Sequence, residues 1–349
     1  MIEYRTFRNT DPPLLAEAWT ACLAGPRTVS IPAKSTTLLE YFVMAKPYFD
    51  PAGLTLALED GRPVGFAHAG FAGNAEGDAL DTSTGVLCTL GVAPGRRRQG
   101  VGSELLRRSE EYMRGRGAKR LLAGPMTPDN PFLFGVYGGC DSPGFLSGNE
   151  AAGPFLMKHG YAPARQCGLF QRNLGGHQVP PDNRFADIRL QYDIVGAPLP
   201  AAGWWRESVL GPIEVFQYDL RDKKTEAVVA SLLLWDMELF GQMWQQSCVG
   251  LLDLLVEPSH RRHGLGRYLL SQVLRHLREQ TFGLFEARID LDNAAGVAFF
   301  EGLGFARVET GTTYRRDVGD QTTDPLGGRT DLHTKTGGGS DKGITFERV

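Results

Sequence analysis

The sequence lacks any paired-cysteine motif. Its five cysteines (Cys22, Cys88, Cys140, Cys167 and Cys248) are scattered without a C-x-x-C pair. Structural zinc sites and disulfide frameworks both depend on closely spaced cysteines, so we predict neither and expect a reducing, cytoplasmic environment. The seven histidines show no H-x-x-x-H spacing with an acidic partner, and no metal site is predicted.

An excess of charge of one sign is also missing, because 37 Lys and Arg face 40 Asp and Glu, for a net charge of −3. A chain without a global basic field is not expected to bind nucleic acid or an anionic membrane. No uninterrupted apolar run approaches the roughly 18 residues of a membrane span. The N-terminal MIEYRTFRNTD has charges where a signal peptide needs its apolar core, so secretion is not expected.

What the sequence does contain is an internal repeat. The chain has 349 residues of ordinary globular composition, a length that favours two domains. VLCTLGVAPGRRRQGVGSELL at residues 86–106 and GLLDLLVEPSHRRHGLGRYLL at residues 250–270 share an apolar strand, a basic turn with two glycines and a helical pattern. A second shared block starts at Asn149 (NEAAGPFLMKHGY) and again at Asn293 (NAAGVAFFEGLGF). The repeat therefore predicts two homologous α/β domains.

We place domain one at residues 1–172 and domain two at residues 184–318, joined by a Gly- and Pro-rich linker at 173–183. Residues 319–349 are polar and rich in Gly and Thr, and we expect a flexible tail. Domain one carries about 20 extra residues near 126–146 and a helical stretch before its first hairpin. We interpret the segment from Asn130 to Pro143 as a lid or an acceptor-specificity loop.

Each glycine turn has the features of an anion-binding site. Arg97-x-x-Gly100-x-Gly102 and Arg261-x-x-Gly264-x-Gly266 join a strand to the start of a helix. The first amides of a helix lack an intrahelical partner, and glycines let an anion approach them, so phosphate binding is the expected chemistry. Neither G-x-G-x-x-G nor the Walker motif is present, so the dinucleotide and P-loop classes are excluded.

These residues resemble a known family. Val92-x-Pro94 with the first turn, and Val256-x-Pro258 with the second, are similar to motif A of the GNAT superfamily of acetyl-CoA-dependent N-acetyltransferases. The blocks that start at Asn149 and Asn293 are similar to motif B. The resemblance covers both domains and implies two tandem α/β domains, each a splayed mixed β-sheet flanked by helices.

The resemblance also implies where acetyl-CoA would bind. Its pyrophosphate would lie on a glycine turn, and its pantetheine would pair with the preceding strand edge. The implied cofactor-binding residues are Leu90, Val92, Arg97, Arg98, Gly100, Val101, Gly102, Ser103 and Asn149 in domain one, and Leu254, Val256, Arg261, Arg262, Gly264, Leu265, Gly266, Arg267, Asn293 and Phe300 in domain two.

The reaction implied by the resemblance is attack of a neutral amine on the thioester, which needs a base. Asp253 is the one carboxylate in the apolar strand CVGLLDLLV and is our candidate base. The alternative is that it hydrogen-bonds a neighbouring backbone group, since a carboxylate in such a strand must be satisfied. Domain one has Thr89 at the corresponding place, so a base there would have to come from elsewhere, such as Asp78 or Asp81.

A general acid is harder to assign. The family often has a Tyr in motif B, four residues before the aromatic of the Gly-aromatic pair, but Met157 and Glu301 stand there, with Leu156 and Phe300 one place earlier. Tyr137 and Tyr314 are candidates that only the fold can place, and the thiolate can also leave unassisted.

The sequence thus predicts an N-acetyltransferase that acts on a primary amine of a small molecule or peptide. The alternatives are a non-catalytic CoA-binding module and an acyltransferase that uses another acyl-CoA. Sequence favours neither domain decisively: domain two has Asp253, whereas domain one has the fuller acceptor-forming region. Trp204 and Trp205 are expected to pack between the domains or over the second sheet, or to line the acceptor site.

Overall fold

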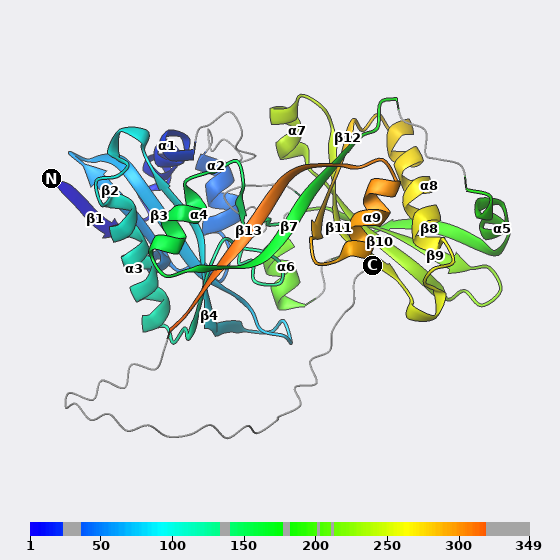
Figure 1. Cartoon of the computed structure of the whole chain (residues 1–349), viewed down its shortest axis with the longest axis horizontal. Coiled ribbons are helices and arrows are strands. Elements are labelled where there is room, and N and C mark those ends of the chain that lie inside the picture. Colours follow the sequence, from blue (N-terminus) through cyan, green and yellow to red (C-terminus); the bar gives the residue numbers. More distant parts are fainter. Residues whose placement is uncertain (24–35, 133–139, 177–181, 201–202, 211–212, 319–349) are drawn as a thin grey trace, which may run out of the picture.

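The computed structural model describes residues 1–23, 36–132, 140–176, 182–200, 203–210 and 213–318. These residues form two lobes that share one 13-stranded sheet (Figure 1). The sheet order is β1-β2-β3-β4-β5-β13-β7-β12-β11-β10-β9-β8, with β6 paired to β13. The mixed α/β sheet flanked by helices that the sequence predicts is therefore confirmed, but the sheet is continuous between the lobes.

The N-terminal lobe is built on antiparallel strands that end in one parallel pair, β4 with β5. Long apolar runs make β3 and β4 buried along most of their length, because helices cover both faces. Its strands are β1 (Ile2–Thr6), β2 (Leu54–Glu59), β3 (Arg62–Gly73), β4 (Leu80–Val92), β5 (Arg120–Ala123), β6 (Phe145–Leu146) and β7 (Ala162–Asn173). Its helices are α1 (Pro12–Leu23), α2 (Thr36–Leu39), the π-helical turn η1 (Glu40–Met44), the 3-10 turns η2 (Pro51–Gly53) and η3 (Pro94–Arg96), α3 (Val101–Gly115) and α4 (Ala152–Lys158).

The C-terminal lobe repeats this plan with a smaller helical cover. Its amphipathic helix α8 buries a regular row of leucines and valines, as the spacing of Leu265, Leu269 and Val273 predicts. The strands are β8 (Tyr192–Pro198), β9 (Val215–Asp222), β10 (Val228–Asp236), β11 (Cys248–Val256), β12 (Leu284–Asp290) and β13 (Ala306–Asp317). The helices are α5 (Arg184–Gln191), α6 (Trp204–Leu210), α7 (Glu238–Trp244), the 3-10 turn η4 (Pro258–His260), α8 (Leu265–Glu279) and α9 (Ala294–Gly302). No described helix is both long and apolar enough to cross a membrane.

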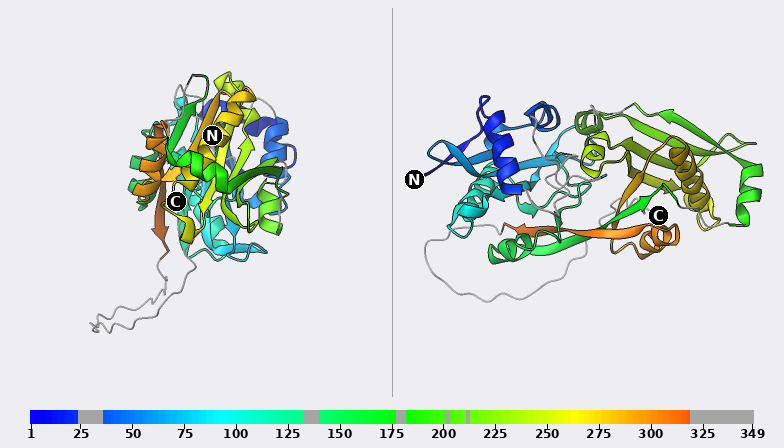
Figure 2. Two further views of the ribbon diagram at one scale, coloured as in Figure 1. Left: turned by 90° about the vertical axis from the view of Figure 1, so that its right-hand side faces the viewer. Right: turned by 90° about the horizontal axis from the view of Figure 1, so that it is seen from above.

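The two lobes exchange a strand at the centre of the sheet. β7, the last strand of the N-terminal half of the chain, pairs with β12 of the other lobe over Cys167 to Asn173. β13, the last strand of the chain, returns to pair with β5 over Tyr314 to Asp317. β7 and β13 also pair with each other along their length, and Figures 1 and 2 show them running side by side between the lobes. Each lobe is therefore completed by a strand from the other half of the chain.

The apolar core divides in the same way. One large cluster, around Phe66, Leu87 and Leu105, fills the N-terminal lobe, and a second, around Leu232, Leu269 and Phe300, fills the C-terminal lobe. A third cluster lies at the junction and joins Cys140 of the long insertion to Trp235 and Phe240 of the C-terminal lobe. The insertion is thus part of the contact between the lobes.

Candidate functional site

The first glycine turn lies exposed at the end of β4. Gly100 caps α3 with φ of 87°, a left-handed conformation that favours glycine. A Cβ placed on Gly100 would have no heavy atom within 4 Å among the described residues, so the space before the helix amides is open. Arg98, two residues earlier, also has a positive φ, of 61°, and its side chain is exposed to solvent. The turn therefore presents free helix amides and a cationic side chain to solvent, as an anion site requires.

The second glycine turn has the same backbone and a different environment. Gly264 caps α8 with φ of 84°, but a Cβ there would lie 2.9 Å from the guanidinium carbon of Arg184. Arg184 makes a two-point ion pair with Asp182, and Asp182 Oδ2 also lies 3.9 Å from Arg267 Nε. These partners hold the pKa of the Asp182 carboxyl at about 2, so it is ionised. The chain thus places its own ion pair over the second turn.

The motif arginines divide between two tasks. Arg97 Nε donates to Val92 O at 3.0 Å, and Arg261 Nε donates to Val256 O at 3.1 Å. Each of these arginines therefore closes its own turn onto the end of the preceding strand. Arg262, like Arg98, is exposed and has positive φ. Arg98 and Arg262 have no side-chain partner among the described residues and can extend towards a ligand phosphate.

The remaining predicted cofactor residues connect the turns to the lobes. Gly102 packs against Phe155 of α4, and Ser103 Oγ lies 3.0 Å from His159 Nε2 at the end of that helix. In the other lobe Arg267 Nη2 donates to Gly302 O of α9 at 3.1 Å. Leu90 and Val92 are partly buried. Four other predicted residues have buried side chains, so only their backbone can contact a ligand: Val101, Leu254, Val256 and Leu265. Gly266 is buried and faces Val256.

The motif B residues have mainly structural partners. Asn293 caps α9, because its Oδ1 accepts from Gly296 N at 2.9 Å. The main chain of Asn149 bonds to Leu146 and Ala152 at the start of α4. Phe300 is buried in the core against Phe299 and Phe305. The geometry thus brings neither Asn149 nor Phe300 to a described cavity.

Both sheets open at the same point. β4 pairs with β5 only over Thr84 to Leu87, and β11 pairs with β12 only over Cys248 to Gly250. Just beyond, each strand has a bulge against its antiparallel neighbour, with Cys88 extra in β4 and Leu252 extra in β11. The next residue of each strand, Thr89 or Asp253, faces His68 of β3 or Leu233 of β10 in register. The splay predicted for each sheet is present, and its polar residues differ between the lobes.

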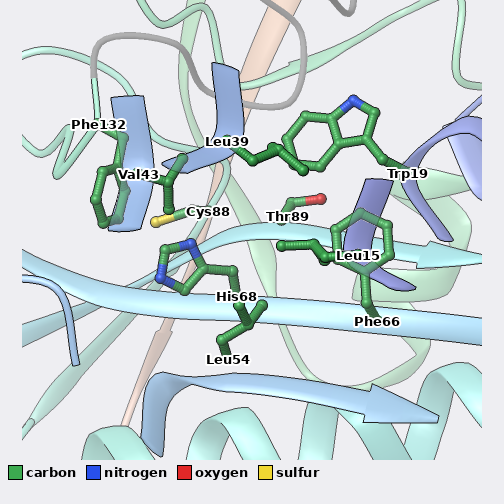
Figure 3. A pocket seen from close by; sticks show the side chains of 10 residues that line it. All are labelled: Leu15, Trp19, Leu39, Val43, Leu54, Phe66, His68, Cys88, Thr89 and Phe132. Carbon is green, nitrogen blue, oxygen red and sulfur yellow. The ribbon is translucent and has the colours of Figure 1, made fainter. Parts of the chain in front are cut away.

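Cavities reach the splay in the N-terminal lobe. A small one of about 20 Å³ is lined by Thr89, His68 and apolar side chains that include Trp19 and Phe132 (Figure 3). A larger one of about 170 Å³ lies beside the part of β3 that follows His68, where β3 no longer pairs with β2. Its lining includes Tyr48, Asp50, Thr82, Tyr112 and Arg116. His68 and Phe132 line both cavities and separate them.

His68 and Thr89 are buried polar groups with no hydrogen-bond partner among the described residues. Thr89 is 2% exposed, and its hydroxyl has no hydrogen bond within the described part of the chain. Neither ring nitrogen of His68 is hydrogen-bonded to a described residue, and the ring packs 4.7 Å from Phe132 and 5.7 Å from Phe49. Burial lowers the pKa of His68 to about 4, although Asp50 opposes the shift. The ring is therefore neutral at physiological pH.

The corresponding face of the C-terminal lobe is filled. A Cβ on Gly250 would lie 2.6 Å from both Cys140 Cβ and Trp235 Nε1, and that indole donates to Cys140 O at 3.0 Å. Cys140 N donates in turn to the buried carboxylate of Glu286 at 2.8 Å. Asp253 is half-buried, and its Oδ1 accepts from the backbone N of Leu254 at 2.9 Å. The hydrogen bond to a neighbouring amide, one of the two interpretations of Asp253, is thus present; its role as a base stays a prediction.

The other candidates are spread over the molecule. Asp78 and Asp81 lie in the turn before β4 and its first residues, where they pair with Asn74 and Ser83. Tyr314 lies on β13 opposite Ala123 of β5, and its hydroxyl occupies the space that a Cβ on Gly153 of α4 would need, at 2.7 Å. Tyr314 thus belongs spatially to the N-terminal lobe. Tyr137 lies outside the described residues.

The insertion and the two tryptophans meet between the lobes. Pro131 and Phe132 pack over Gly70 in the N-terminal lobe, whereas Cys140 and Asp141 bond to the C-terminal lobe. Residues 133–139, the centre of the proposed lid, lie outside the described part of the chain. Trp205 packs on Tyr48 at 4.8 Å and over Gly73, so it lies between the lobes, and Trp204 lies beside it.

Sequence reasoning missed His68, Arg184 and Trp235, and it included Phe132 only as part of the segment from Asn130 to Pro143. None of them belongs to a motif, and each acts through a neighbour that is distant in sequence. For His68 a signal existed in principle, since a lone histidine in the apolar run PVGFAHAGF is unusual in a buried strand. That His68 lies opposite Thr89 could be known only from the register of the sheet. The described side chains form no group of His, Cys, Asp or Glu that could hold a metal ion.

Each lobe has a glycine turn and a splayed parallel pair of strands. In the N-terminal lobe the turn is exposed and a cavity adjoins the splay, whereas the C-terminal copy is covered. Together these features define a duplicated acyl-CoA-type transferase fold. The sequence model of the acetyltransferase (GNAT) family matches residues 20–137 and 204–305, one region in each lobe. These matches span more than half of the chain. The chain belongs to the acetyltransferase (GNAT) family, and it is an N-acetyltransferase.

Several known proteins are similar to this chain over most of its length. A mycothiol acetyltransferase of Geodermatophilus obscurus is 27% identical over 288 residues, which is 75% of this chain and 86% of the relative. One of Salinispora arenicola is 26% identical over 336 residues, or 88% of this chain and 94% of the relative. Among solved structures, a tandem GNAT protein from the clavulanic acid biosynthesis pathway has a TM-score of 0.62 at 18% identity, over 91% of this chain and 98% of its own. That likeness establishes the fold.

Proposed function

We propose that the protein transfers the acetyl group of acetyl-CoA to a primary amine of a small molecule, and that the N-terminal lobe carries out this reaction. The observation that carries the proposal is the continuity of three features along β4: the open turn at Gly100, the splay after Leu87 and the cavities beside Thr89. A thioester donor that enters from the turn would present its carbonyl at the splay, next to the cavities.

The donor's phosphates would bind at Gly100. The free amides at the start of α3 and the exposed Arg98 supply positive charge for the pyrophosphate. Pantetheine would then follow the strand edge from Leu90 to Val92, where β5 no longer pairs. Acetyl-CoA supplies the activated acetyl group, and the protein supplies proximity and a dry wall around the thioester.

Two features make the C-terminal lobe the weaker candidate. The ion pair of Asp182 and Arg184 lies over its glycine turn, so the Arg184 side chain occupies space that a pyrophosphate would need. Trp235 and Cys140 fill the face where an acceptor would have to approach Gly250. We infer that this lobe is mainly structural, with Asp253 bound to its neighbouring amide.

The relatives provide a second candidate for the acceptor. Proteins named mycothiol acetyltransferase match most of this chain at 26–27% identity, so the unacetylated form of mycothiol belongs in any acceptor screen. The cavity of about 170 Å³ favours a smaller acceptor, since an engineered cavity of roughly 150 Å³ accommodates benzene.

The donor site is tested by calorimetric titration of acetyl-CoA into the wild type and into Gly100→Glu and Gly264→Glu. Both glycines cap a helix with nearly the same positive φ, so backbone strain is matched; the variants differ in the lobe and in the Arg184 side chain that Gly264→Glu would displace. The added carboxylate should repel the pyrophosphate and weaken binding about 100-fold or more in Gly100→Glu, while Gly264→Glu binds within about twofold of the wild type.

Loss of binding in Gly264→Glu alone would move the donor to the C-terminal lobe. Absence of binding in the wild type would refute the acetyl-CoA donor itself. Longer acyl-CoA donors titrated in parallel show whether another acyl group is preferred.

A further inference from the structure

The strand β4 connects two openings of the N-terminal lobe. Its C-terminal end leads to the glycine turn at Gly100, and its N-terminal part, at Leu80 and Thr82, lines the larger cavity. The bulge at Cys88 lies between them. If the donor occupies the first opening, an acceptor that enters through the second meets it near the bulge.

His68 is positioned at this meeting point. It lines the larger cavity, which reaches Asp50 and Arg116, and also the smaller cavity, which reaches Thr89 and Trp19. Figure 3 shows the side chains of His68 and Thr89 on the same face of the sheet, among the apolar side chains of Leu15, Val43 and Phe66. A molecule moving from the larger cavity to the splay must pass this imidazole.

The two side chains differ from most buried polar groups in having few partners among the described residues. The hydroxyl of Thr89 is buried without a hydrogen bond, and the ring nitrogens of His68 bond to no described residue. A buried hydroxyl without a hydrogen bond destabilises a folded protein. An unsatisfied hydroxyl opposite a buried imidazole in register, with both residues lining one cavity, is typical of a site whose ligand supplies the missing partner.

We propose that His68 and Thr89 form the acceptor site of the N-terminal lobe, in which His68 takes the proton of the attacking amine and the Thr89 hydroxyl orients its nitrogen. The inference rests on the acetyl transfer proposed above. Because burial keeps the imidazole neutral, an unprotonated ring nitrogen is available to the amine at physiological pH.

The proton and electron changes balance within the site. The amine nitrogen attacks the thioester carbon, so an N–C bond forms while the C–S bond breaks and its electron pair leaves with the CoA sulfur. The proton lost by the nitrogen passes to His68. A buried imidazolium is strongly acidic, so it returns the proton to the thiolate or to solvent, leaving an amide, CoA thiol and the original imidazole.

The lining of the cavities indicates the class of acceptor. Among the described residues no carboxylate lines the small cavity, and apart from His68, Cys88 and Thr89 its walls are aromatic and aliphatic side chains. The described lining offers an ammonium ion no counter-charge, so we infer that the amine enters in its neutral form. We infer a small apolar primary amine, with its nitrogen between His68 and Thr89 and its apolar part in the larger cavity, along Phe49, Phe71 and Phe132.

The C-terminal lobe lacks this pair. Leu233 replaces His68 in register, and Asp253 replaces Thr89. The duplication therefore left the imidazole in one copy only, and activity that depends on it belongs to the N-terminal lobe.

The test compares His68→Phe, His68→Gln and Thr89→Val with the wild type at saturating acetyl-CoA, after an amine panel has identified an acceptor. Phe keeps an aromatic ring against Phe132, Gln keeps a hydrogen-bond acceptor without a useful base, and Val keeps the shape of Thr. His276→Phe is the matched control, since His276 is exposed on α8 of the other lobe.

We expect kcat to fall about 100-fold in both His68 variants, with acetyl-CoA affinity unchanged within about twofold. Thr89→Val should raise the acceptor KM about tenfold. His276→Phe should match the wild type. Full activity in His68→Phe, or recovery of kcat in His68→Gln to within about threefold, would overturn the role of the imidazole as proton acceptor, because a merely structural or hydrogen-bonding role survives in those variants.

A measurement on the wild type is independent of how the variants fold. In nitrogen-15 histidine NMR, one ring should not titrate between about pH 5 and 8, and adding the acceptor should shift that ring alone. An acceptor that is acetylated but leaves this resonance unmoved refutes the site while leaving the acetyltransferase function intact. A wild type that binds no acetyl-CoA refutes the proposed function instead.

Discussion

At the scale of single residues, the two copies of the repeat have the same motifs, but different side chains pack around those motifs. Gly100 and Gly264 have nearly identical backbones, yet one is open and the other lies under Arg184. Arg97 and Arg261, which resemble phosphate ligands in sequence, bond to the ends of their own strands. The motif therefore specifies a turn, and the residues that pack around it decide what the turn can bind.

The buried His68 makes stability depend on pH. Its pKa of about 4 in the folded protein lies below the value near 6.5 of the unfolded chain, so the unfolded chain binds the proton more readily between these values. Stability from this residue is therefore complete above about pH 6.5 and falls as the pH drops towards 4.

The comparison is urea unfolding of wild type and His68→Phe at neutral pH and near pH 4.5. The wild type should lose about 2–3 kcal/mol more than the variant between these conditions, because carboxylates titrate in both proteins and cancel. Equal losses in the two proteins would mean that His68 is protonated as easily in the folded state as in the unfolded one.

At the scale of elements, the long insertion of the N-terminal half serves the other lobe. Its last residues reach β10 and β12: the Trp235 indole donates to Cys140 O, and Arg288 Nε donates to Asp141 Oδ2 at 2.7 Å. Arg288 is almost fully buried and also pairs with Asp290. The segment predicted as a lid is thus anchored at this end, and its anchor closes the acceptor face of the second sheet.

Breaking this anchor should be costly. Arg288→Ala leaves the carboxylates of Asp141 and Asp290 without their buried cation, and removing one partner of a buried pair costs about 3–5 kcal/mol. The matched control is Arg315→Ala, whose ion pair with Asp317 is exposed and is worth at most about 1 kcal/mol. Chemical denaturation of both variants measures the difference; a cost for Arg288→Ala no larger than that of the control would show that the anchor is not a stabilising contact.

At the scale of the whole molecule, the exchanged strands make the two lobes interdependent. β13 lies between β5 and β7, and β7 lies between β13 and β12, so neither half of the chain contains all strands of its own lobe. The sequence boundary between residues 172 and 184 remains a sensible proposal for the duplication unit, whereas the sheet passes through it without interruption.

Fragments 1–183 and 184–318, expressed separately, should therefore not fold. Each lacks a central strand and exposes two unpaired edges, which favours aggregation. Co-expression should restore a soluble complex, and the intact chain should unfold in one cooperative transition by circular dichroism and by tryptophan fluorescence. Cooperative unfolding of either isolated fragment would contradict this interdependence.

The features that the sequence could predict are those that depend on residues close together in the chain. Helix α8, the glycine turns and the strands before them were predictable because periodicity and turn chemistry are local properties. The splay and the family resemblance followed from the same local motifs. The position of Tyr314 in the N-terminal lobe and the pairing of His68 with Thr89 depend on strand register, which no local pattern encodes.

The sequence by itself determined the duplication, the mixed α/β class and two turns able to bind an anion, because each depends on residues that are close together in the chain. Only the tertiary structure decided which turn is open, which splay adjoins a cavity, and that each lobe borrows a strand. Those properties arise where Arg184 meets Gly264, Cys140 meets Gly250 and β13 meets β5. Such contacts join residues far apart in the chain, and folding alone brings them together.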